Sequence, residues 1–208
     1  MTKPRLTYFD SPRSRGEECR LALWLAGVDF EDRRLPRTEW PALKPKTPFG
    51  SLPIFEVEGK PAVSQSNAIL GHIGRRYGLL PKDDWEAMRL ESLLSAAEDL
   101  RHAVNRTLGI KDEAELRQKR AELVAGPIKT WGTNIERQVV GPFAGGAEIS
   151  VADVKLFIVI GWLKGGVLDH VPADCLDEFP KLNKLYESVK QHPKVVAWRA
   201  RPESGHAS

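Results

Sequence analysis

The sequence predicts an α/β domain followed by an all-helical domain. In the first 80 residues, short apolar runs bounded by Gly and Pro alternate with segments of helical spacing, in the order β-α-β and then β-β-α. From Asp84 onward, almost every segment places apolar residues three and four positions apart, which is typical of helices. Pro81 lies between these regions and blocks continuation of the preceding helix. We therefore predict domains at residues 1–80 and 84–208.

The first four segments follow from periodicity and from breakers. Arg5–Phe9 is predicted as a strand and Arg15–Leu25 as a helix, with Cys19 on its buried face. Asp29–Arg34 is predicted as a short second strand. The proline-rich stretch Pro36–Pro48 is predicted as a loop.

A hairpin and a helix complete the first domain. Ile54–Val57 and Pro61–Val63 are predicted as antiparallel strands, because the Glu58-Gly59 pair between them suits a turn. Asn67–Tyr77 has the spacing of a helix with one apolar stripe.

The second domain is predicted from helical periodicity alone. Ser150–Leu163 is nearly all apolar, as expected of a helix buried on most sides. The other expected helices are Glu86–Leu108, Glu113–Val139 with an interruption near Gly126-Pro127, Pro180–Gln191 and Lys194–Ala200. Ser150 and Asp153 have the spacing of a capping box, which is a structural feature rather than a chemical one.

Composition excludes several classes of protein. A 208-residue chain with 41% hydrophobic residues can bury one large core or two small ones. The net charge of +3 is small for this length, so we expect no nucleic-acid partner. No apolar run approaches the roughly 20 residues of a membrane span, so we expect no membrane partner. Cys19 and Cys175 lack CxxC spacing and the His residues lack metal-ligand spacing, which predicts a reduced, cytoplasmic protein without a metal site.

The stretch Pro48–Ile69 carries the clearest chemical signal. Pro53 opens a strand although it has no N–H to pair, which suggests that something external uses the neighbouring backbone. A cis Leu52-Pro53 bond would present the N–H and C=O of Leu52 to an extended peptide. Ser66 begins a helix, whose N–H groups and positive dipole end suit a carboxylate. A peptide edge beside a carboxylate site describes a binding site for glutathione.

The order of these motifs resembles the glutathione transferases. The resemblance covers nearly the whole chain and is closest to the sigma class among the tyrosine-type enzymes. It rests on Leu6-Thr7-Tyr8-Phe9, Glu17…Arg20, Trp40-Pro41…Lys44…Pro48-Phe49-Gly50, Gln65-Ser66 and Ile149-Ser150-Val151-Ala152-Asp153. It implies a thioredoxin-like first domain, an all-helical second domain, and glutathione as co-substrate with no permanently bound cofactor.

The resemblance implies that Tyr8 activates the thiol. A free thiol has a pKa of about 8.5, and a phenol that donates to the sulfur favours the thiolate. The structural alternative is a tyrosine that fills the interface between sheet and helix. Arg15 would stabilise the thiolate by its charge. Ser11 is the alternative activator, because Ser11-Pro12 resembles the serine-type enzymes and the loop is one residue longer than the sigma pattern.

The remaining implied residues bind the rest of glutathione. Trp40 and Lys44 would hold its glycine carboxylate, whereas Gln65 and Ser66 would hold its γ-glutamyl end. The other expected contacts are Gly50, Ser51, Leu52, Pro53 and, from a neighbouring subunit, Asp99.

We therefore predict a cytoplasmic, homodimeric glutathione transferase of the detoxification type. The thiolate would attack a small hydrophobic electrophile. Two alternatives stay open at this point. One is a non-catalytic glutathione-binding or structural relative of the fold, and the other is a glutathione-dependent isomerase or peroxidase.

Overall fold

The computed structural model describes residues 2–201. These residues form two compact units. One unit runs from the N-terminus to Asp84 and includes the chain from Gln191 onward, and the other spans Trp85–Lys190. The domain limits expected from the sequence, 1–80 and 84–208, stay predictions, and residues 202–208 lie outside the described part.

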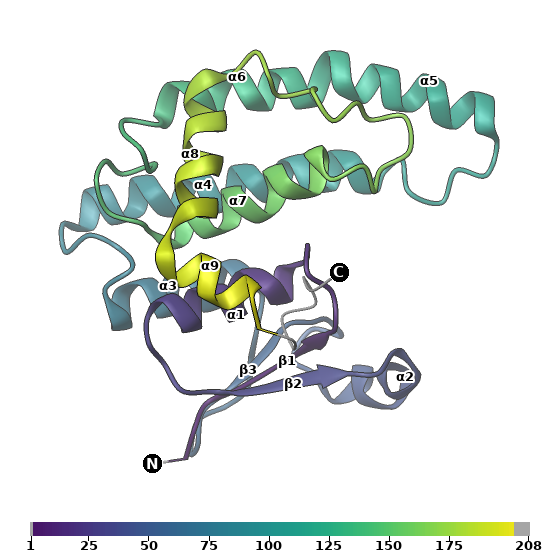
Figure 1. Ribbon diagram of the computed structural model, residues 1–208. Coiled ribbons are helices and arrows are strands. Elements are labelled where there is room, and N and C mark those ends of the chain that lie inside the picture. The colour runs from purple at the N-terminus through teal and green to yellow at the C-terminus, as the bar shows by residue number, and fades with distance from the viewer. Residues whose placement is uncertain (1, 202–208) are drawn as a thin grey trace. The chain divides into compact units, whose positions relative to one another are not determined.

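A four-stranded mixed sheet forms the centre of the first unit (Figure 1). Its strands are β1 (Arg5–Phe9), β2 (Glu31–Leu35), β3 (Ile54–Glu56) and β4 (Val63–Ser64), in the order β2-β1-β3-β4. β1 pairs in parallel with β2, whereas β3 is antiparallel to both β1 and β4. The predicted βαβ-ββα order is thus confirmed, although β2 begins two positions later than expected and β4 is shorter and shifted.

Three helices gather on one face of this sheet (Figure 1). α1 (Arg15–Leu25) packs on β1 and on α3 (Ser66–Tyr77), and α9 (Pro193–Arg199) packs on α1. Leu6 on β1 and Leu70 on α3 are fully buried in this packing, and Cys19 on α1 is buried as expected. This packing fixes the N-terminal end of α1 against the carboxyl end of β1.

The stretch between β2 and β3 differs from the prediction of a loop. It contains three short helices, η1 (Arg37–Glu39), α2 (Trp40–Leu43) and η2 (Lys44–Lys46). Pro41 and Pro45 stand in the first turns of α2 and η2. In a first turn, the fixed φ of proline favours a helix and its missing N–H costs nothing. The prolines therefore start helical turns here instead of preventing them.

The second unit is all-helical, as predicted. Its elements are α4 (Asp84–Asn105), α5 (Glu113–Leu123), η3 (Val124–Ile128), α6 (Lys129–Gln138), α7 (Val151–Lys164) and α8 (Pro180–Gln191). The interruption expected near Gly126-Pro127 is η3, a π-helical stretch that contains Pro127. Because proline lacks an N–H, the regular α-helical bonding changes at this point.

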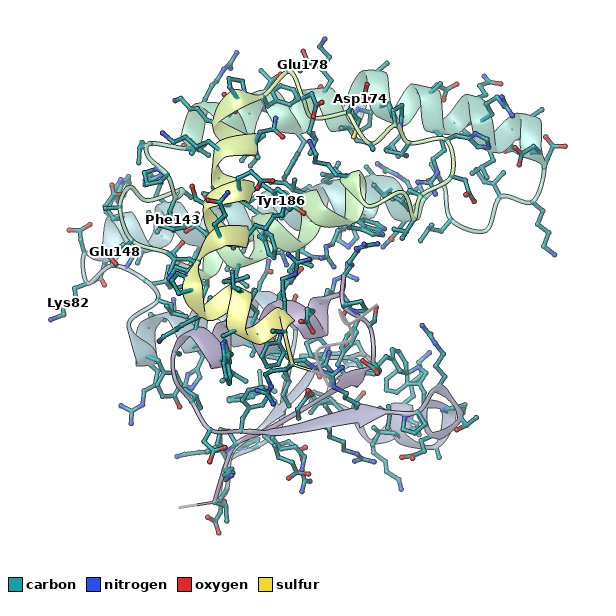
Figure 2. All side chains as sticks on the ribbon, viewed as in Figure 1. Lys82, Phe143, Glu148, Asp174, Glu178 and Tyr186 are labelled. Carbon is teal, nitrogen blue, oxygen red and sulfur yellow. The ribbon has the colours of Figure 1, made fainter. Side chains whose placement is uncertain are left out.

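α7 forms the core of this second unit, and its residues Val151–Ile160 are all buried. The predicted capping box is present: the Ser150 hydroxyl accepts from the N–H of Asp153, whose carboxylate accepts from the N–H of Ser150. Tyr186 projects from α8 towards α7 (Figure 2), where its ring stacks on Phe157 at 5.0 Å. In the described part of the chain, no helix combines the length and apolar character that a membrane crossing needs.

Candidate glutathione site

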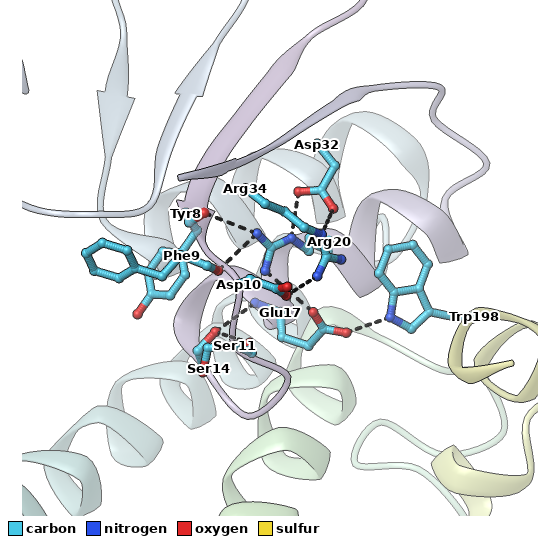
Figure 3. Close-up of polar contacts among 10 residues, drawn as sticks. All are labelled: Tyr8, Phe9, Asp10, Ser11, Ser14, Glu17, Arg20, Asp32, Arg34 and Trp198. Carbon is cyan, nitrogen blue, oxygen red and sulfur yellow. Dashed lines mark hydrogen bonds and ion pairs between the residues drawn. The ribbon is translucent and has the colours of Figure 1, made fainter. Parts of the chain in front are cut away.

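Tyr8 lies near the carboxyl end of β1 and its ring packs on the first turn of α1. A Cβ added to Gly16 would stand 2.3 Å from the Tyr8 ring, so only glycine permits this close approach. Figure 3 shows the phenol oxygen on the far side of the ring from the neighbouring ion cluster. Tyr8 is half-buried. The ring thus packs against the first turn of α1, while the phenol oxygen points away from the ion cluster.

A buried ion cluster supports the main chain at Tyr8 (Figure 3). The Arg20 guanidinium donates to the carbonyl oxygens of Tyr8 and Phe9, at 3.4 and 3.2 Å, and to Asp32 at 2.7 Å. The Glu17 carboxylate accepts from the indole N–H of Trp198 at 2.6 Å. Because both α1 and α9 contribute to this cluster, the end of β1 is held from one side by packed side chains.

The loop before α1 is organised by Ser14. Its hydroxyl donates to the carbonyl of Ser11 at 2.7 Å and accepts from the N–H of Glu17 at 3.3 Å, which makes Ser14 the N-cap. Arg15 is the first residue of α1 and is half-buried, like Ser11. A helix N-terminus carries partial positive charge, so Arg15 and the start of α1 together favour an anion beside them.

Trp40 and Lys44 lie on the short helices that follow β2. The Phe9 ring makes edge-to-face contacts with the rings of Tyr8 and Trp40, at centroid distances of 5.7 and 5.9 Å. The Lys44 side chain reaches within 3.7 Å of the position that a Cβ on Gly50 would take. Gly50 has a φ of +61°, which favours glycine. Aromatic contacts through Phe9 thus connect Trp40 to Tyr8. The Lys44 side chain lies next to the turn before β3.

The turn at residues 47–53 leads into β3. The Thr47 hydroxyl donates to the carbonyl of Lys44 at 2.9 Å and accepts from the N–H of Ser51 at 3.1 Å. The Leu52-Pro53 peptide bond is cis, as predicted. The Ser51 carbonyl accepts from the Ser64 hydroxyl at 3.4 Å, which ties this turn to β4.

Gln65 and Ser66 form the junction between β4 and α3. Gln65 has a φ of +79° and a ψ of 108°, which a residue with a side chain rarely adopts. Such conformations cost about 1–3 kcal/mol and cluster at functional sites. Ser66, the first residue of α3, is only 4% exposed. Its position places a hydroxyl at a helix N-terminus, where N–H groups are available to an anion.

Eleven of the predicted residues belong to the first unit, on β1, on the loop before α1 and its first residue, on α2 and η2, in the cis turn and at the start of α3. They are Tyr8, Ser11, Arg15, Trp40, Lys44, Gly50, Ser51, Leu52, Pro53, Gln65 and Ser66. Asp99 belongs to the second unit, where it is exposed on α4.

Sequence reasoning missed the supporting roles of three residues, Gly16, Arg20 and Thr47. Gly16 carried a signal, because a glycine in the first turn of a helix next to a candidate tyrosine suggests close approach. The roles of Thr47 and Arg20 depend on contacts that only the fold creates. Across residues 2–201, no three His, Cys, Asp or Glu side chains gather in a way that could hold a metal ion.

Comparison with known proteins identifies the family. Residues 4–75 match the family model of the glutathione S-transferase N-terminal domain, and residues 98–202 match that of the C-terminal domain. Glutathione S-transferase 1 of Ascaris suum is 33% identical, over 98% of this chain and 99% of its own length.

Solved structures also resemble nearly the whole chain. The structure of prostaglandin synthase D of Nilaparvata lugens has a TM-score of 0.84 at 26% identity, and covers 97% of this chain and 99% of that one. The structure of monomeric Na-GST-3, a glutathione S-transferase from the hookworm Necator americanus, has a TM-score of 0.78 at 26% identity, with 97% and 98% covered.

The chain belongs to the glutathione S-transferase family. The predicted family, fold class and enzyme class are thereby confirmed. The similarity to a prostaglandin synthase agrees with the sigma-class resemblance. The alternative of a non-catalytic relative is not favoured, and the same holds for an isomerase or peroxidase in place of a transferase.

Proposed function

We propose that Tyr8 activates the thiol of glutathione for attack on a small hydrophobic electrophile. The observation that carries this proposal is the placement of the phenol: its ring rests on Gly16 and its oxygen points away from the ion cluster (Figure 3). A hydroxyl held in this way donates to the sulfur and favours the thiolate. The N-terminal end of α1 and the Arg15 side chain add positive potential to the same locality.

The remaining residues of the proposed site bind the other parts of glutathione. The Trp40 indole N–H and the Lys44 ammonium bind the glycine carboxylate as neutral and charged donors. Gln65 and Ser66 bind the γ-glutamyl end, supported by the burial of Ser66 at the start of α3. The main chain of Leu52 pairs with the cysteinyl unit, and Gly50, Ser51 and Pro53 shape the turn that presents it.

The electrophile meets an apolar surface next to the sulfur. The edge-to-face rings of Tyr8, Phe9 and Trp40 provide such a surface in the first unit. We place the protein in the cytoplasm, because Cys19 and Cys175 are both free, which suits a reducing compartment.

The active form in this proposal is a homodimer in which α4 packs against its mate. Trp85 and Met88, in the first turns of α4, are 71% and 51% exposed, which is unusual for large apolar side chains. Asp99, on the same helix, would reach the γ-glutamyl amine in the partner. Sedimentation velocity at micromolar concentration tests this assembly: a dimer is expected, and a monomer alone would remove the role of Asp99.

The pH dependence of kcat/KM tests the activating residue. Tyr8→Phe is expected to retain glutathione affinity, lose rate at pH 7, and recover part of that rate as pH rises, because only the thiolate attacks. Ser11→Ala is the matched control and is expected to keep the wild-type profile. The opposite pattern, a normal Tyr8→Phe profile beside a displaced Ser11→Ala profile, would assign activation to the serine.

A further inference from the structure

Arg20 is a buried cation with an unusual set of partners. Its side chain is 0% exposed. Nε donates to Asp32, one terminal nitrogen donates to the carbonyls of Tyr8 and Phe9, and the other lies 3.6 Å from the Glu17 carboxylate. The planar guanidinium fork allows one side chain to join the main chain of one strand to acidic groups from α1 and β2.

The carbonyl groups that accept from Arg20 lie at the end of β1, beyond the last residue that pairs with β3. β3 pairs with β1 only as far as Thr7, which faces Ile54, whereas β2 continues to Phe9. The last two residues of β1 therefore have a strand on one side only. Arg20 supplies hydrogen bonds to the carbonyl oxygens of both residues.

The same helix face also fixes the ring of Tyr8. Gly16 and Arg20 are four residues apart on α1 and so lie one above the other. Gly16 contacts the ring and Arg20 holds the backbone of Tyr8. One helix thus sets both the position and the direction of the phenol.

Arg34 provides a comparison within the same cluster. It donates through Nε to Asp32 at 3.0 Å and pairs through a terminal nitrogen with Asp10 (Figure 3). Arg20 and Arg34 thus share Asp32, one through each carboxylate oxygen. The side-chain contacts described for Arg34 are with carboxylates, whereas those of Arg20 include the main chain at Tyr8.

We propose that Arg20 is a positioning residue for thiol activation. It fixes the backbone at Tyr8 so that the phenol hydroxyl stays within hydrogen-bonding reach of the glutathione sulfur. This inference rests on the proposed role of Tyr8. Hydrogen bonds weaken steeply with distance and angle, so a small shift of the strand end lowers the preference for the thiolate.

The test compares Arg20→Lys with Arg34→Lys, the same substitution in the same cluster. The thiolate absorbance of bound glutathione is titrated against pH at saturating glutathione, and thermal unfolding is followed in parallel. Arg20→Lys is expected to raise the pKa of the bound thiol by about half to one unit, a roughly three- to tenfold loss of thiolate below that pKa. Arg34→Lys is expected to lower the melting temperature without moving the thiol pKa.

Three results would overturn the inference. An unchanged thiol pKa in a destabilised Arg20→Lys protein would make Arg20 purely structural. Equal shifts in both variants would assign the effect to a general loosening of the cluster, not to the bond from Arg20 to the main chain at Tyr8. If Arg20→Lys does not fold, Asp32→Asn loosens the hold on Arg20 and is expected to give a smaller rise; no rise would likewise overturn the inference.

Tyr8→Phe in the same titration separates this inference from the proposed function. If Tyr8→Phe leaves the thiol pKa at the wild-type value, the role of Tyr8 fails, and that of Arg20 fails with it. If Tyr8→Phe raises the pKa, the double variant Tyr8→Phe/Arg20→Lys is expected to match Tyr8→Phe alone, because Arg20 acts through Tyr8. A further rise in the double variant would contradict action through the tyrosine.

Discussion

The starts of α1 and α7 have the same four-residue capping pattern, but the acidic residue of the pattern has a different role in each helix. Each begins with a serine followed three residues later by an acid, Ser14 with Glu17 and Ser150 with Asp153. In both helices the serine hydroxyl accepts from the N–H of the acidic residue. The two carboxylates then meet different partners.

At α7 the carboxylate serves its own helix start. Asp153 accepts from the N–H and hydroxyl of Ser150 and from the N–H of Ala144, at 2.6 to 2.8 Å. Burial raises the pKa of Asp153, while these hydrogen bonds act to lower it. At α1, Glu17 instead contacts Arg20 and the indole N–H of Trp198. A capping motif therefore predicts the helix start, but not the use of its acid.

The largest expected effect follows from breaking the α7 start. Asp153→Ala would leave buried donors of Ser150 and Ala144 without an acceptor, which should lower the free energy of unfolding by on the order of 4 kcal/mol. Ser150→Ala, which removes only the cap hydroxyl, should cost about 1 kcal/mol. Urea unfolding measures the free energy of unfolding of both variants. Equal decreases in the two would contradict the larger contribution of the Asp153 carboxylate.

An intermediate effect is expected at the α1 start. Gly16→Ala would push a methyl group into the Tyr8 ring, so the phenol must move. We expect kcat/KM at pH 7 to fall by about tenfold, a transition-state cost of about 1.4 kcal/mol. Gly126→Ala is the control, since open space surrounds that position. A Gly16→Ala enzyme with wild-type kcat/KM would show that ring placement is unimportant.

The smallest effect concerns a third helix start, that of α9. His192 is its N-cap residue, and burial, together with the charge of Lys194, lowers the pKa of its imidazole. Above the unfolded-state pKa of about 6.5, His192 is neutral in both the folded and the unfolded protein. As pH falls through that value, the unfolded protein binds the proton first, so the free energy of unfolding decreases. Between pH 7.5 and 5.5, the melting temperature of the wild-type protein should therefore fall slightly more than that of His192→Asn. Parallel pH curves for the two proteins would exclude this contribution.

Periodicity and breakers were sufficient to predict most of the fold. Pro180–Gln191 and Arg15–Leu25 were predicted to the residue, because apolar spacing and neighbouring Gly or Pro mark their ends. The stretch Pro36–Pro48 was predicted wrongly, since a proline in a first helical turn and one in a loop look alike in sequence.

The site was predictable as a set of residues but not as a geometry. Leu52-Pro53, Gln65-Ser66 and Tyr8 carry local signals: a strand-opening proline, a helix start and a strand end. The hold of Arg20 on the carbonyl of Tyr8 joins residues twelve positions apart through tertiary packing. The positive φ of Gln65 likewise has no sequence signal, because glutamine rarely adopts it.

The most direct test of the account is the pKa of the glutathione thiol bound to Tyr8→Phe, with Asp153→Asn as the control from the other helix start. Ultraviolet absorbance of the thiolate is followed from pH 5 to 9 at saturating glutathione. In Tyr8→Phe, the pKa of the bound thiol is expected to rise by about one unit or more, with glutathione affinity retained. In Asp153→Asn, the thiol pKa is expected to keep its wild-type value while the melting temperature falls. An unchanged thiol pKa in Tyr8→Phe would contradict the account.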